Sequence, residues 1–241
     1  MSNVVAALIL LLITTFLVAA GGSAVTEFNK DTAAVSTETM ENDMEQFEGA
    51  VHEAAASEAG GSRVEIARGA EAGQGAFTIQ QVSAASVTID GNVAFNTTTG
   101  RVIGESPNGG VVVYEMGAVF ARTPDGSVEM VDPPRMAFVN TTNNRPSVTV
   151  PLYTLETQGP IGGTVTVRRT SPPDETDSVY ANTFFSLSIQ SPFYAEWAEY
   201  FRASAPNANI LVFPDQQVAR ISITTGDGTY VHINEYDLIV Q

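Results

Sequence analysis

The segment SPNGGVVVYEMGAVFARTPDG, residues 106–126, contains two apolar runs bounded by turn sequences. The flanking tetrapeptides, Ser106-Pro107-Asn108-Gly109 and Thr123-Pro124-Asp125-Gly126, place a proline where a β-turn presets φ and a glycine at the fourth position. The runs between them, Gly110–Met116 and Ala118–Arg122, are rich in Val, Tyr and Phe, which favour strands. We therefore predict two adjacent strands here and a β-rich fold around them.

Similar short runs extend along most of the chain after residue 76. Asp90-Gly91 between two of them suits a tight hairpin that needs positive φ. A strand roughly every 8–12 residues is typical of an antiparallel sandwich or a wrapped sheet. The further strands that we predict are Phe77–Val82, Ser86–Asp90, Asn92–Asn96, Arg101–Glu105, Ser127–Val131, Arg135–Asn140, Ser147–Glu156, Gly163–Thr170, Ile210–Phe213, Val218–Thr224 and Thr229–Val240.

One helix interrupts the strands. Ser191 is a favourable N-cap, Pro192 suits a first turn, and the aromatic-rich run Phe193–Arg202 follows. Its aromatic side chains at positions 193, 197, 200 and 201 lie on one side of a helix. We predict that Trp197 anchors this helix to the sheet, in preference to an aromatic platform that binds carbohydrate.

The start of the chain has a different character. Residues 4–20 read VVAALILLLITTFLVAA, and no charged side chain occurs before Glu27. A bilayer core is crossed by about 20 residues of helix, so this run is long enough to span one. The alternative is a cleaved secretory signal, because Gly22-Ser23-Ala24 offers small residues to a signal peptidase. The lack of Lys and Arg before Val4 favours a retained helix.

The next segment, Glu27–Glu58, has the pattern of an acidic amphipathic helix. Its nine acidic side chains are opposed by Lys30 alone. After Gly21-Gly22 the apolar residues recur mostly three, four or seven apart, and they are Val25, Phe28, Val35, Met40, Met44, Phe47 and Val51. This apolar stripe needs a partner surface, either on the chain's own domain or on neighbouring copies. We predict a nearly continuous helix from about Ser2 to Glu58, bent at Gly21-Gly22.

The predicted fold class is therefore α+β. A long N-terminal helix, hydrophobic and then amphipathic, precedes a mainly antiparallel β head domain with one short aromatic helix. The predicted organisation is an N-terminal helix over residues 1–58, a Gly-rich linker over residues 59–76, and a β-rich head over residues 77–241.

The composition limits the partners and the chemistry. The chain has 27 acidic and 11 basic residues, a net charge of −16, and no cysteine. Such a charge disfavours nucleic acid as a partner and suits concentrated salt, where repulsion is screened. An acidic surface with little Lys resembles proteins of salt-loving archaea. Asn96-Thr97-Thr98 and Asn140-Thr141-Thr142 are sequons, and they predict glycosylation of Asn96 and Asn140 if the domain lies outside the cell.

Signatures of enzymes are missing from the sequence. No phosphate-binding loop, zinc-protease motif or serine-hydrolase elbow occurs. His52 and His232 lie far apart, and we interpret Asp174–Asp177 as a solvated turn in preference to a cation site. The prediction is a protein that is not an enzyme and that uses no cofactor or metal.

Three parts of the chain together resemble a known family. The uncharged start Ser2–Ala7, the amphipathic continuation and the β-rich head resemble archaeal type IV pilin-like proteins. Gly110–Ala118 and Ser191–Trp197 look like segments of a haloarchaeal pilin-like family. Bacterial members usually carry Glu at the fifth mature position, where this chain has Val5.

The resemblance implies a structural role. A pilin is held in the cytoplasmic membrane by its apolar helix and then assembles with identical or related subunits into an extracellular filament, major or minor in rank. The side chains that it assigns to the helical filament core are Val4, Val5, Leu8, Leu11, Leu12, Phe16, Phe28 and Phe47. The alternative is a monomeric cell-surface binding protein anchored by a single membrane-spanning helix.

Overall fold

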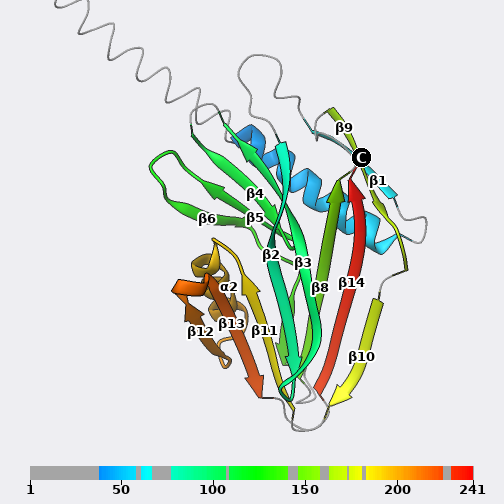
Figure 1. The fold of residues 1–241 in the computed structure, drawn as a ribbon, viewed down its shortest axis with the longest axis vertical. Coiled ribbons are helices and arrows are strands. Elements are labelled where there is room, and N and C mark those ends of the chain that lie inside the picture. Colours follow the sequence, from blue (N-terminus) through cyan, green and yellow to red (C-terminus); the bar gives the residue numbers. More distant parts are fainter. Residues whose placement is uncertain are drawn as a thin grey trace, which may run out of the picture.

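The computed structural model describes residues 38–57, 61–66, 77–106, 109–140, 146–157, 163–172, 174–180, 183–224 and 229–240. Strands dominate this part of the chain, which forms a curled half-barrel (Figure 1). The strands are β1 (Gly61–Ile66), β2 (Phe77–Ile89), β3 (Asn92–Glu105), β4 (Val111–Glu115), β5 (Ala118–Arg122), β6 (Val128–Asp132), β7 (Ala137–Asn140), β8 (Pro146–Thr157), β9 (Gly163–Arg169), β10 (Asp174–Tyr180), β11 (Phe184–Gln190), β12 (Asn209–Phe213), β13 (Val218–Thr224) and β14 (Thr229–Val240). The helices are the N-terminal helix, described over residues 38–56, α2 (Tyr194–Ser204) and the short 3-10 helix η1 (Pro214–Gln216).

The strands form two sheets. The larger sheet has eight strands in the order β12-β13-β11-β2-β3-β4-β5-β6, and the smaller has the order β1-β9-β14-β8-β7 with β10 beside β14. Neighbours are antiparallel with one exception, because β14 runs parallel to β8. The β2–β3 hairpin closes at Asp90 and Gly91, whose φ angles are 51° and 79°, as the predicted turn requires.

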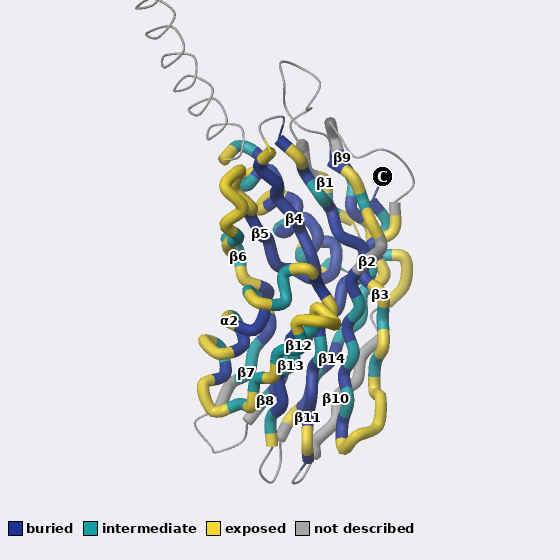
Figure 2. Tube along the Cα trace, turned by 60° about the vertical axis from the view of Figure 1, so that its left-hand side comes forward, coloured by how far each residue is buried: buried dark blue, intermediate teal, exposed yellow. Residues whose placement is uncertain are grey.

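Two clusters of buried side chains fill the space around the sheets. The first joins α2, through Trp197 and Phe201, to both sheets. Trp197 is fully buried and meets Phe120 of β5 edge to face at 5.7 Å, which confirms that it anchors the helix. The second cluster joins the N-terminal helix to both sheets, and Figure 2 shows buried positions running through the strands that surround it.

The predicted α+β class with a long N-terminal helix is wrong. The described chain is mainly β, and the described part of the N-terminal helix, residues 38–56, lies within the fold as part of its second core. Its apolar stripe, which includes Met40, Met44 and Val51, is buried by the chain's own sheets. The sequence pattern showed that the stripe needs an apolar partner surface. The chain's own sheets supply it in preference to a neighbouring copy, because an intramolecular surface is always present at a high effective concentration. Residues 1–37, including the apolar run and the Gly21-Gly22 bend, lie outside the described residues.

The predicted organisation also needs correction. β1 lies within residues 59–76, which were predicted to be a linker, and β10 covers Asp174–Asp177, which were predicted to be a turn. β11 was not predicted, because its sequence FFSLSIQ mixes Ser and Gln with apolar residues and pairs with strands distant in sequence. β2 and β3 are each longer than the two short strands predicted within them, since bulges let one strand continue through an irregular pattern.

The start of α2 differs from the prediction by two residues. The N-cap position is Phe193 and makes no side-chain cap. Ser191 instead accepts a hydrogen bond on its Oγ from the backbone N–H of Phe193 at 3.0 Å. Ser191 therefore shapes the turn that leads into the helix.

Candidate functional site

The contact between the N-terminal helix and the sheets is close. Phe47 and Tyr114 of β4 are both fully buried and meet edge to face, with ring centroids 5.2 Å apart. A Cβ atom at Gly104 of β3 would lie 2.6 Å from Cε1 of Phe77 on β2 and 2.7 Å from Cε of Met40 on the helix. Glycine at this position therefore leaves room for the Phe77 ring and the end of the Met40 side chain.

The C-terminal end of the helix is held by polar contacts. Arg169 of β9 donates a hydrogen bond from Nη1 to the carbonyl oxygen of Ala55 at 2.7 Å. Ser62 of β1 donates to the carboxylate of Glu53 at 2.6 Å. The last carbonyls of a helix lack partners within it and carry partial negative charge, so a guanidinium there is favourable. The helix is thus held by apolar packing along its side and by hydrogen bonds at its C-terminal end.

An ion pair between a buried carboxylate and a half-exposed guanidinium joins the middle of the helix to the loop before β7. Glu48 is only 5% exposed, and its Oε1 lies 3.4 Å from Nε of Arg135. Burial raises the pKa of Glu48, and the Arg135 charge opposes that rise. On the same helix, burial lowers the pKa of His52, and Arg135 lowers it further. The Glu48–Arg135 contact thus links the helix to the loop before β7.

The N-terminal end of the described helix is acidic. Glu38 and Glu45 are exposed there, and Glu41 lies between them. Burial raises the pKa of Glu41, and the like charges of Glu45, Glu129 and Glu38 raise it further. Glu41 therefore lies among carboxylates that repel its charge.

This repulsion predicts a dependence on salt. We expect the melting temperature of the full chain in detergent to rise by a few degrees between 0.1 M and 2 M NaCl, because the screening length falls from about 10 Å to under 3 Å. Thermal unfolding followed by circular dichroism measures this. A Glu41→Gln, Glu45→Gln variant should show a smaller rise, and an equal rise in the variant would contradict the assignment to these carboxylates.

A second polar cluster lies in the interior, around Glu115 at the end of β4. Glu115 is fully buried. Its Oε2 accepts a hydrogen bond from Ser83 Oγ at 2.7 Å, and its Oε1 accepts one from Trp197 Nε1 at 3.0 Å. Nε of Arg101 lies 3.8 Å from Oε2. The carboxylate therefore joins β2, β3 and α2 at one point.

The environment of Glu115 fits a structural role. Burial raises the pKa of Glu115, while hydrogen bonds from Ser83, Ser191 and Trp197 and the charge of Arg101 oppose the rise. A raised carboxyl pKa in a cleft would suggest acid–base catalysis. Glu115 has no exposed surface, however, so no substrate can reach it in this conformation. The one sequence signal for this residue is an acidic side chain inside the apolar run VVVYE.

A small hollow lies where β8, β9 and β14 meet. It has a volume of about 180 Å³ and is lined by Thr154, Glu156, Thr170, Asp237, Leu238 and Ile239. Thr170 Oγ1 donates to the backbone oxygen of Asp237 at 3.1 Å, which uses one of the polar groups in the wall. Sites for small organic ligands are usually about 300–1,000 Å³ and mostly apolar, so this hollow does not resemble one.

The predicted site residues are distributed as follows. Asn96 is exposed on β3, and Asn140 is the last residue of β7. Phe47 was assigned to the filament core, and the structure corrects this, because the side chain is buried in the core of its own head. The other assigned residues, from Val4 to Phe28, lie outside the described residues.

The two histidines lie in separate parts of the fold. His52 lies on the N-terminal helix, and His232 lies in β14, where its Nε2 is 2.8 Å from Nδ2 of Asn234. Within the described ranges no group of three or more metal-ligating side chains occurs. Among the same residues no helix is both long and apolar enough to cross a membrane.

The chain belongs to DUF7289, a family of unknown function, whose model matches residues 1–241. No curated protein and no solved structure matches the chain.

Proposed function

Because the function of this family is unknown, we propose from the molecule itself that the chain is a structural subunit of an extracellular type IV pilus-like filament. In this proposal residues 4–20 lie in the cytoplasmic membrane before assembly and among identical or related subunits afterwards. The β fold forms the outer wall of the filament at the cell surface. The subunit contributes assembly and needs no catalytic residue.

The observation that carries the proposal is the burial of the N-terminal helix in the head. Phe47 packs against Tyr114 at the side of the helix, and Arg169 holds its C-terminal end. A pull on the chain before Glu38 is therefore transmitted to the cores of both sheets and not to a loose connection. A filament subunit under tension needs such a connection between its assembly segment and its head.

The composition of residues 4–20 supplies the second argument. Aliphatic side chains dominate the run and no charge interrupts it. Such segments associate through close packing both in lipid and among themselves, so one segment suits storage in the membrane and packing in a filament. A head-to-tail contact that does not close generates a helical assembly of any length.

Leu11→Asp tests the proposal. A charge in the middle of an apolar span costs about 2.5–3.5 kcal/mol on insertion scales, so we expect filaments to be lost. The measurement is electron microscopy of material sheared from cells, with an immunoblot for the chain. The matched control, Leu11→Met, keeps an apolar side chain of similar volume and should still assemble.

A measurement on the head tests whether filaments are lost only because the head has unfolded. Near-ultraviolet circular dichroism of the detergent-solubilised Leu11→Asp variant should retain the signal of Trp197, which is buried far along the chain. If the wild-type chain occurs at the cell surface only as a monomer embedded in lipid, the filament proposal is wrong and the anchored binding protein is correct.

A further inference from the structure

The outer face of the larger sheet is almost free of charge over five neighbouring strands. On β12, β13, β11, β2 and β3, alternate side chains such as Ile221, Leu187 and Ala85 enter the core. The side chains between them point outward. We call these outward side chains, from residues 209–213, 218–224, 184–190, 84–88 and 93–98, the outer face. Arg220 is the one charged residue among them.

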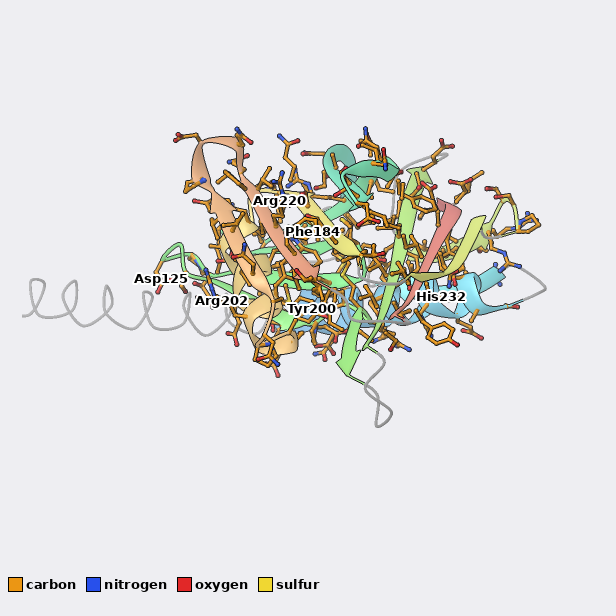
Figure 3. All side chains as sticks on the ribbon, turned by 90° about the horizontal axis from the view of Figure 1, so that it is seen from below. Asp125, Phe184, Tyr200, Arg202, Arg220 and His232 are labelled. Carbon is orange, nitrogen blue, oxygen red and sulfur yellow. The ribbon has the colours of Figure 1, made fainter. Side chains whose placement is uncertain are left out.

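The register of the strands places one row straight across this face. Leu211 pairs with Arg220, Arg220 with Ser188, Ser188 with Ser86, and Ser86 with Asn96, so a glycan on Asn96 would stand at the β3 end of this row. Arg220 donates a hydrogen bond from Nε to Ser188 Oγ at 2.8 Å, and its guanidinium lies 5.2 Å from the centre of the Phe213 ring. The one cation is thus engaged within the face. Figure 3 shows Arg220 and Phe184 on the side of the molecule opposite Tyr200 and Arg202 of α2.

The outer face also carries most of the exposed large apolar side chains. Among the residues that the structure describes, four such side chains are strongly exposed. Val93, Phe184 and Leu211, at 64%, 46% and 40% exposure, belong to the outer face. The fourth, Tyr230, lies on the smaller sheet at 48% exposure. Apolar groups gathered on one face mark a site of interaction more strongly than scattered ones.

The charge of the chain indicates which partner the face suits. Two copies with a net charge of −16 repel each other wherever carboxylates meet, as around Glu41. The outer face has no carboxylate, so two copies can approach there without this cost. Its hydroxyl and amide groups both donate and accept hydrogen bonds, so the same surface can pair with itself or with a neighbouring part of itself.

We propose that the outer face is a contact between the heads of neighbouring copies of this chain. The inference rests on the proposed function for the identity of the neighbour, and it adds the part of the head that the neighbour touches. Five strands about 4.8 Å apart and six residues of about 3.3 Å each give a face of about 400 Å² in projection. A stable interface buries about 800 Å² on each partner, so this contact is weak between free monomers. It becomes effective when the subunits are held close together by their N-terminal segments.

The absence of cysteine in the chain permits a direct test. Leu211→Cys places a single thiol on the outer face, and Tyr230→Cys places a thiol of similar exposure on the smaller sheet as the matched control. Each variant is treated with a water-soluble maleimide, first as a detergent-solubilised monomer and then as purified filaments. We expect assembly to slow the labelling of Leu211→Cys by about tenfold, because labelling then requires a neighbouring head to detach. The labelling of Tyr230→Cys should stay within a factor of about two.

The outcomes of this experiment test the inferred contact and the proposed filament separately. If filaments form and Leu211→Cys labels as fast as in the monomer, the inferred contact is wrong and the proposed function stands. If no filaments form, the proposed function is wrong, and the same labelling is done in proteoliposomes that contain only this chain at low and high protein density. Protection that grows with density then supports the contact. Protection that is absent or independent of density overturns it.

Discussion

Phe47→Ala should lower the free energy of unfolding by about 3–5 kcal/mol, because it removes a fully buried aromatic ring from the contact between the N-terminal helix and the larger sheet. The loss has two parts, the lost transfer of the ring out of water and the cavity left beside Tyr114. Urea unfolding of the detergent-solubilised chain, followed by circular dichroism, measures the change. This effect is a large fraction of the stability of a typical domain.

The matched control for this variant is Phe184→Ala. Phe184 has the same side chain but is 46% exposed, so its removal from the monomer should cost well under half as much. Equal effects of the two variants would show that the N-terminal helix does not contribute to the core. The finding that this helix belongs to the core of the head would then be wrong. Removal of residues 1–57 should for the same reason leave a chain that does not fold.

Glu115→Ala should cost about 3 kcal/mol, because it leaves the N–H of Trp197 without its buried acceptor and Arg101 without its nearest carboxylate. Glu115→Gln keeps a carbonyl oxygen that can accept from Trp197 and removes a buried charge. Because Glu115→Gln also removes the carboxylate beside Arg101 but keeps an acceptor for Trp197, we expect it to cost less stability at pH 7 than Glu115→Ala. Urea unfolding at fixed pH measures both variants.

The pH dependence of the stability of these variants tests the contribution of the Glu115 charge. The pKa of Glu115 is raised in the folded state above its ordinary value of 4.5, so the folded state binds more protons than the unfolded state between the two values. The stability that this group contributes is therefore full below pH 4.5 and is lost as the pH rises through the folded pKa. Glu115→Gln lacks this loss.

The stability of Glu115→Gln relative to the wild type should therefore increase as the pH rises above about 4.5. Glu41 and Glu48 have raised pKa values in both proteins, and the lowered pKa of His52 acts in the opposite direction in both, so the difference isolates Glu115. A difference that is constant with pH would show that Glu115 titrates as an exposed carboxylate does.

Several features of the fold are determined by the sequence alone, because their causes are local. The hairpin at Asp90-Gly91 follows from the φ angles that a tight turn needs. The anchoring of α2 by Trp197 follows from the spacing of its aromatic side chains. The helix over residues 38–56 likewise follows from the period of its apolar stripe. In each case the signal comes from residues that lie close together in the sequence.

The tertiary structure alone decides which surfaces these elements meet. The stripe of the N-terminal helix is the same whether it faces a neighbouring copy or its own sheets, and only the curl of the two sheets selects the second. The partners of Glu115 lie 32 and 82 residues away along the chain, so no local pattern identifies them. The row from Leu211 to Asn96, in which Arg220 carries the one charge, exists only because the strand order brings β12, β13, β11, β2 and β3 side by side. Periodicity shows which side chains need a partner, and long-range pairing determines which partner each of them has.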